Sequence, residues 1–108
     1  MFANIVTIPA ADTGYTLTTL LTTAGADLPS VRRVACIKIT MITGASYLVP
    51  LTGTIVTTVG DTPDQYGFDF AAAGTFFEMA YPSNNISLDD IILAGDALAT
   101  LAVYGYAI

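Results

Sequence analysis

The sequence contains no histidine and no tryptophan, and only one cysteine, Cys36, among its 108 residues. Without histidine, the Ser-His-Asp and Cys-His arrangements of nucleophilic catalysis cannot be built, and neither can a histidine-ligated zinc site. A single cysteine forms no disulfide within the chain, so we expect Cys36 to be a small buried thiol inside a strand. Gly-rich phosphate-binding loops are also missing. We therefore predict a chain that is not an enzyme and holds no cofactor.

Charge is scarce, and positive charge most of all. Charged residues make up 11% of the chain, against about 25% in typical soluble domains. The basic residues are Arg32, Arg33 and Lys38, and the net charge is −6. A nucleic-acid surface needs a basic stripe to neutralise phosphates, so we expect no nucleic-acid partner.

Hydrophobic residues, in contrast, make up 54% of the sequence. A domain of this size buries only about 60–65% of its unfolded surface, so part of the apolar excess has to stay outside its own core. An apolar surface of this kind usually marks an interface. We therefore expect the partners to be other protein subunits.

Long apolar runs are absent as well. A membrane-spanning helix needs about 20 apolar residues, whereas Ile37–Ile42 is already interrupted by Lys38 and Thr40. The first residues, Met1–Asn4, lack the basic region of a secretory signal, so we expect no export by that route. Five prolines and nine glycines break the chain at short intervals, which disfavours amyloid-like stacking. One packed domain over residues 1–108 is the expectation.

Short β-branched and aromatic segments recur along the chain, with turn residues between them. The clearest is Val31–Ile42, which places Ile37, Ile39 and Met41 on one face of a strand. Further strands are predicted at 3–8, near a sheet edge, and at 46–49, 54–59, 65–70 and 75–81. Strands at this spacing are typical of a sandwich or barrel.

One segment departs from the strand pattern. Apolar residues between Tyr15 and Gly25 recur at helical spacing, and Gly25 suits the position after a helix end. These residues are Leu17, Leu20, Leu21 and Ala24. The predicted fold class is therefore mostly β, a single antiparallel β-sandwich or jelly-roll-like domain with one short helix near residues 15–25.

The C-terminal part of the chain is predicted to form a hairpin. Ile86–Leu93 is predicted as one strand, Ala94–Asp96 as a turn containing glycine, and Ala99–Tyr106 as the returning strand. Tyr104 and Tyr106 share one face of that last strand, and an apolar chain end of this kind is expected to be docked in a sheet or against a neighbour.

Carboxylates are the remaining candidates for chemistry. Asp61 and Asp64 flank a proline, which favours a solvated turn over a calcium site, because EF-hand ligand spacing is missing. The neighbouring Asp89 and Asp90 would point to opposite faces of a strand and cannot form a catalytic pair alone. We therefore predict no catalytic residue and no metal site.

Aromatic residues gather in the middle and at the end of the chain. Alternating aromatics in strands are more often core or interface than the lining of a ligand groove, which is the other interpretation. The residues that we predict to form a subunit interface are Phe76, Phe77, Tyr104 and Tyr106.

Two segments carry a family resemblance. The first is Leu20–Pro29, a short helix ending in Ala-Gly and followed by Val31–Arg33 and a strand. The second is Ile86–Asp96, whose Leu-Asp-Asp-Ile stretch precedes a last strand. Together they resemble small virion proteins of tailed bacteriophages, over most of the chain but through loose motifs. The aromatic-rich middle, Gln65–Tyr81, departs from that pattern and leaves the strand order open.

This resemblance implies a capsid decoration or cement protein. Such a protein stabilises the particle by binding capsid subunits as a homo-oligomer, and it would lie in the virion after assembly in the host cytoplasm. A tail or head-fibre component is an alternative from the same class. A carbohydrate- or cell-binding β-sandwich module is an alternative from another class, and an enzyme using paired carboxylates is a third.

Overall fold

The computed structural model describes residues 1–11, 13–49 and 68–108. The predicted strand at 54–59, the loop with Asp61 and Asp64, and the first three residues of the predicted strand at 65–70 lie outside these residues. The described part of the chain contains a single helix and ten strands. Their bounds are β1 Phe2–Thr7, β2 Tyr15–Thr16, α1 Leu17–Thr23, β3 Arg33–Val34, β4 Cys36–Thr43, β5 Ser46–Leu48, β6 Phe68–Phe70, β7 Phe76–Ala80, β8 Ile86–Ser87, β9 Ile92–Gly95 and β10 Thr100–Tyr106.

The strands are nested around the middle of the chain. β1 pairs with β10, β2 with β9, β3 with β8, β4 with β7 and β5 with β6, and every pair is antiparallel. The described strands therefore form one long hairpin, with β5 and β6 as its innermost pair. Two further pairings, β10 with β4 and β5 with β9, roll this hairpin up.

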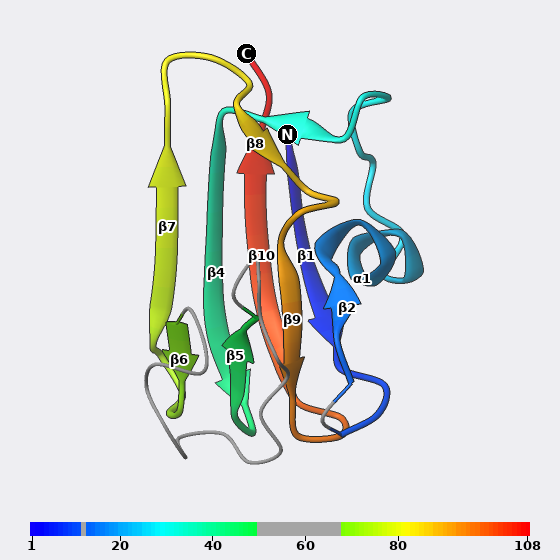
Figure 1. Cartoon of the computed structure of the whole chain (residues 1–108), viewed down its shortest axis with the longest axis vertical. Helices are drawn as coiled ribbons and strands as arrows, with labels where there is room; N and C mark the ends of the chain where they lie inside the picture. Colours follow the sequence, from blue (N-terminus) through cyan, green and yellow to red (C-terminus); the bar gives the residue numbers. More distant parts are fainter. Residues whose placement is uncertain (12, 50–67) are drawn as a thin grey trace.

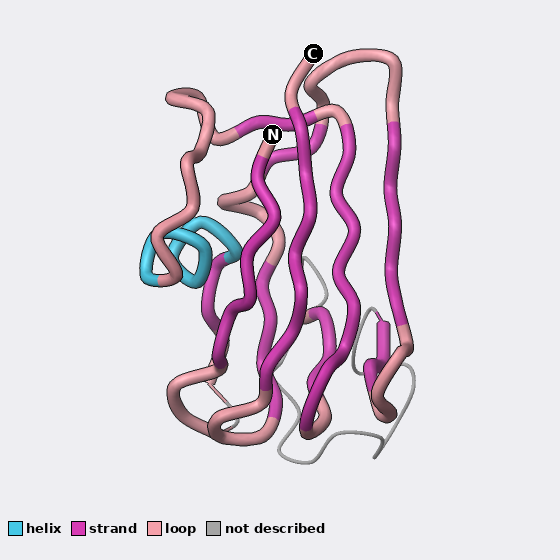
Figure 2. The backbone as a smooth tube through the Cα atoms, turned by 180° about the vertical axis from the view of Figure 1, so that it is seen from behind, coloured by secondary structure: helices cyan, strands magenta, loops and turns pink. Residues whose placement is uncertain are grey.

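Rolling produces two four-stranded sheets that face each other. The first has the order β1-β10-β4-β7 and the second the order β2-β9-β5-β6, while β3 and β8 form a short separate pair. Figures 1 and 2 show the first sheet as one layer of four long strands and the second, shorter sheet as the other layer. A rolled hairpin with this nesting is the jelly-roll arrangement. The predicted mostly-β, antiparallel sandwich is confirmed.

Side-chain alternation explains which face of β4, an inner strand of the first sheet, packs against the core. Ile37, Ile39 and Met41 are buried in the core between the sheets, as their spacing predicts. Cys36 points to the other face, where its thiol is buried and forms no disulfide. In β10, Gly105 leaves room for a neighbouring ring: a Cβ there would lie 2.6 Å from Phe2 Cζ.

The helix is held at both ends by its own sequence. The Thr16 side chain accepts a hydrogen bond from the Thr19 amide at the N-terminus. At the C-terminus Gly25 has φ +81°, its amide donates to the Thr22 carbonyl, and the next amide, of Ala26, donates to the Leu21 carbonyl. This is a Schellman motif, which needs glycine because a left-handed residue with a Cβ is strained.

The buried face of α1 is made by Leu17, Leu20 and Leu21, and Ala24 packs partly against the same core. The predicted helix is therefore confirmed. It lies along the β1 and β2 side of the sandwich (Figure 1), where the Asn4 side chain donates to the Ala24 carbonyl at 3.5 Å. None of the described helices is long and apolar enough to cross a membrane.

The C-terminal hairpin prediction is wrong. Ile86–Leu93 is interrupted after β8 by a turn at Leu88–Asp89, and β9 and β10 belong to different sheets. The connection between them crosses from one sheet to the other. It is fixed by Asp96, whose amide donates to the Ala45 carbonyl at 2.9 Å while its carboxylate accepts from the Ala45 amide at 3.2 Å.

Candidate protein-protein interface

The first sheet turns one face to the core and the other away from it. We call the second the outer face. Its side chains come from alternate positions of β1, β10, β4 and β7, and the strand register arranges them in rows. One row holds Ala3, Tyr104, Lys38 and Glu78, and the next holds Ile5, Ala102, Thr40 and Phe76. At the end of the face nearest the chain termini, Tyr106, Cys36 and Ala80 form a third row.

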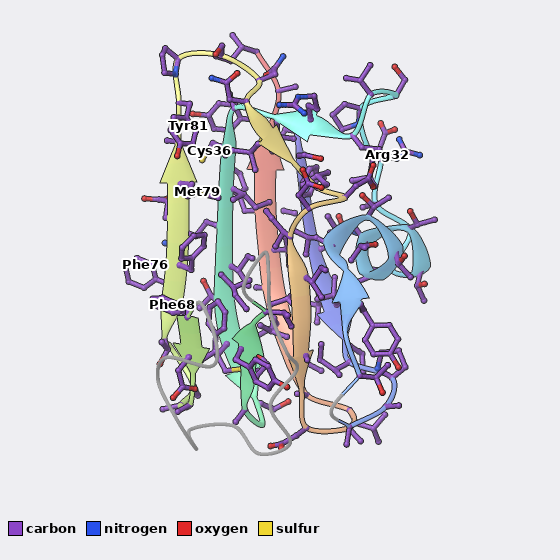
Figure 3. All side chains as sticks on the ribbon, in the orientation of Figure 1. Arg32, Cys36, Phe68, Phe76, Met79 and Tyr81 are labelled. Carbon is purple, nitrogen blue, oxygen red and sulfur yellow. The ribbon has the colours of Figure 1, made fainter. Side chains whose placement is uncertain are left out.

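Aromatic side chains dominate the β10 and β7 parts of this face. Phe76 is 54% exposed, and Tyr104 and Tyr106 are each 38% exposed. The two tyrosine rings meet edge to face with centroids 6.1 Å apart. The Lys38 ammonium lies 4.7 Å from the centre of the Phe76 ring, a cation–π contact. In Figure 3 the Phe76 ring projects away from the body of the molecule at β7.

The structure divides the predicted interface residues between two faces. Phe76, Tyr104 and Tyr106 lie together on the outer face. Phe77 lies on the inner face of β7, where it packs against the core, and its ring centroid is 5.4 Å from that of Phe68. Successive side chains in a strand point to opposite sides, so the partly buried Phe77 does not share the outer face with the other three residues.

Small side chains open a hollow in the middle of the outer face. Its lining includes Ala3, Ala102, Ile5, Tyr104 and Lys38, and its volume is about 350 Å³. Ile5 is 62% exposed beside it. The hollow offers shape and apolar contact, and its border carries a single charged group.

The outer face is close to electrically neutral. Lys38 and Glu78 are register partners on neighbouring strands, and they are its charged residues among those described. The other described carboxylates lie in loops and turns or on the second sheet, at Asp27, Asp69, Asp89, Asp90 and Asp96. Negative charge is therefore concentrated away from this face.

One titratable group on this face is perturbed. Tyr106 lies opposite Cys36 in the register of β10 and β4. Charge on the neighbouring Cys36 sulfur, partial desolvation and a side-chain hydrogen bond with Cys36 raise the pKa of Tyr106 above its usual value. The phenol therefore remains a neutral hydrogen-bond donor throughout the physiological pH range.

The β7 edge adds backbone groups to the same surface. Among the described strands, β7 is the last of its sheet. The Thr75 carbonyl and the Tyr81 amide both bond to the β4 side. Because these directions alternate along an antiparallel strand, the backbone groups of Phe76, Glu78 and Ala80 point away from β4. An edge of this kind can accept another chain.

A second hollow, of about 430 Å³, lies between β7 and the segment that runs from β8 to β9. Met79, Tyr81, Ile86 and Ile91 supply its apolar lining, and Met79 and Tyr81 are labelled in Figure 3. Its cation, Arg33, already donates to the carbonyls of Asn84 and Asn85, both at 3.1 Å. This hollow can take an apolar side chain, but it presents no arranged set of reactive groups.

No group of three or more potential metal ligands occurs among the described residues. Asp89 accepts a 2.6 Å hydrogen bond from the Thr18 hydroxyl and lies in a turn, so the prediction that Asp89 and Asp90 alternate along a strand is wrong. Asp96 accepts a hydrogen bond from the Ala45 backbone amide, at the turn after β9.

Comparison with known proteins gives no relative. No family model matches the chain, and neither a curated protein nor a solved structure matches it.

Proposed function

We propose that the protein is a structural subunit of a virus particle, a decoration or cement protein that stabilises the capsid by binding its subunits as an oligomer. The observation that carries the proposal is the outer face of the first sheet. It is aromatic, close to neutral and accessible in a chain whose net charge is −6. Interfaces are typically enriched in aromatic residues and poor in charge at their centre.

The fold is compatible with this role without deciding it. Jelly rolls occur in capsid proteins, lectins and cupins, and a fold hosts functions that only its sites distinguish. Here the prominent surface feature is an apolar face with one lysine and one glutamate. The virion assignment itself comes from the resemblance of the two sequence segments, and the face supports the binding part of the proposal.

The particle is where the proposal is tested. Virus particles from the organism that encodes the chain are purified on a density gradient, and the copy number of this protein is measured by quantitative mass spectrometry. We expect a copy number that matches the symmetry of the shell. Absence from the particles, or only trace amounts, would contradict the proposal.

A binding experiment locates the surface. Purified protein is added to particles stripped of it, and the bound fraction is measured by co-sedimentation. We expect Tyr104→Ser and Phe76→Ser to reduce binding, because an oligomer assembled through the outer face binds several capsid sites at once. Val31→Ser is the control, because Val31 is an apolar residue that is 69% exposed and lies in the turn before β3, outside the strands of the first sheet. Equal loss with all three variants would argue against the outer face.

A further inference from the structure

We infer that the outer face of the first sheet binds a second copy of the same chain about a two-fold axis, with Lys38 of each copy paired to Glu78 of the other. This inference rests on the proposed function, which requires an oligomer, and it names the surface and geometry of that oligomer.

Charge distribution favours a second copy at this face. Two copies with a net charge of −6 repel each other in most orientations. On the outer face one positive and one negative group, Lys38 and Glu78, stand next to each other on β4 and β7. Such a face is self-complementary, which is what a two-fold interface requires, because the same patch is used on both sides.

Both charges are available for such a pair. The Lys38 ammonium lies over the Phe76 ring, and no ion pair joins Lys38 to another described residue. Consider a two-fold axis that lies between two facing outer faces, runs parallel to the strands and passes midway between β4 and β7. It places Lys38 of one copy over Glu78 of the other. The same operation forms the second, identical pair.

The same axis also uses the tyrosines. β10 lies one and a half strand spacings from this axis, or about 7 Å. That distance places Tyr104 and Tyr106 of one copy beside the β7 edge of the other, which pairs with no further described strand and where Phe76 is exposed. The aromatic rings then cover a strand edge that would otherwise be open to unrelated chains.

The exposed aromatic area of the outer face sets the expected strength of dimerisation. Phe76, Tyr104 and Tyr106 are 54%, 38% and 38% exposed, so aromatic side chains of about 200 Å² each leave roughly 260 Å² accessible. A standard interface takes about 800 Å² from each partner. We therefore expect weak, concentration-dependent dimerisation that strengthens where many copies are held close together.

Charge reversal tests the pairing. Sedimentation equilibrium is measured over a range of concentrations for the native chain, Lys38→Glu, Glu78→Lys and the double variant. The native chain should move from 11.2 kDa toward twice that mass. Each single variant should weaken dimerisation about tenfold, and the double variant should restore it to within about threefold.

The two single variants separate a specific pair from general repulsion. Lys38→Glu takes the net charge from −6 to −8, whereas Glu78→Lys takes it from −6 to −4. General repulsion predicts stronger association for Glu78→Lys, and the specific pair predicts weaker association for both. Arg32→Glu, which makes the same charge change as Lys38→Glu outside the face, should leave the dimer within about twofold. Far-UV circular dichroism confirms that each variant is folded.

A native chain that stays monomeric at every concentration would overturn the inference, as would stronger association of Glu78→Lys or a double variant that fails to recover. These outcomes are independent of the particle test. A monomeric protein found in stoichiometric amounts in particles would refute the two-fold pairing and the oligomeric part of the proposed function, and would leave the place in the virion standing. A dimer that never occurs in particles would refute the virion role alone.

Discussion

Phe76 and Phe77 are consecutive residues of β7 whose side chains lie on opposite sides of the first sheet. Phe76 is 54% exposed on the outer face, and Phe77 packs against the core with its ring edge to face with that of Phe68. These two adjacent phenylalanines therefore differ in their expected contribution to stability.

We expect Phe77→Ala to lower the free energy of unfolding by about 3 kcal/mol, because it leaves a cavity in the core. Phe76→Ala should change it by less than about 0.5 kcal/mol, because its ring already contacts water. Urea unfolding followed by circular dichroism measures both. A larger loss for Phe76→Ala than for Phe77→Ala would show that β7 presents the opposite face to the core.

The sequence predicted those elements whose two faces differ in chemistry. In β4 the buried residues Ile37, Ile39 and Met41 alternate with Lys38 and Thr40, so period two identifies both the strand and its inner face. The helix was predictable for the same reason, since its four apolar positions and Gly25 follow the geometry of one amphipathic helix with its cap.

Where both faces are apolar, the pattern could not assign a side. The stretch from Phe76 to Tyr81 is apolar or aromatic at every position except Glu78, so the faces of Phe76 and Phe77 follow only from pairing with β4. The C-terminal hairpin failed for a different reason. Ile92–Gly95 and Thr100–Tyr106 are close in sequence, but long-range partners, β2 and β5 for one and β1 and β4 for the other, draw them into different sheets.

Gly95 allows the closest backbone approach between β9 and β5. A Cβ at this position would lie 2.5 Å from the Ala45 carbonyl oxygen and 2.6 Å from Ser46 Cα. We expect Gly95→Ala to cost about 3 kcal/mol, the upper end of the usual range for overpacking, because backbone atoms have to move. Gly74→Ala is the control, since that site has positive φ but open space around it, and it should cost about 1–2 kcal/mol. Thermal unfolding ranks the two, and the reverse order would contradict the close contact.

Leu98 has φ 64° in the connection between β9 and β10 and is 71% exposed. A left-handed residue with a Cβ costs about 1–2 kcal/mol. Glycine relieves that strain, but it loses more conformational entropy on folding, which offsets about 0.5–1 kcal/mol of the gain. Leu98→Gly should therefore stabilise the fold by up to about 1 kcal/mol. Leu98→Ala keeps the Cβ and should give no gain. Chemical denaturation compares them, and a Leu98→Gly variant less stable than Leu98→Ala would show that the backbone is not strained.

Asn84 binds the backbone of Ile108 through both ends of its amide. Its nitrogen donates to the Ile108 carbonyl at 3.0 Å, and its oxygen accepts from the Ile108 amide at 2.8 Å. Asn84→Ala should raise the exchange rate of the Ile108 amide about tenfold or more, because two hydrogen bonds of about 1 kcal/mol each are lost. Asn85→Ala is the control. Amide exchange by NMR measures the effect, and an unchanged rate would show that this contact does not hold the end of the chain.

The Tyr106–Cys36 pair predicts a specific alkaline titration. Because the pKa of Tyr106 is raised in the folded state, the native protein holds that proton more tightly than the unfolded chain, whose tyrosines titrate near about 10. Stability is therefore unaffected below the unfolded pKa and falls as the pH rises from it through the raised native pKa.

Replacing Cys36 with alanine removes both the charge and the hydrogen bond on the phenol, so the pKa of Tyr106 should fall toward the unfolded value. Tyrosinate absorbance measures this, with Tyr106→Phe subtracted from the native curve to isolate one phenol. Superimposable titration curves for the native chain and Cys36→Ala would mean that the sulfur does not act on Tyr106.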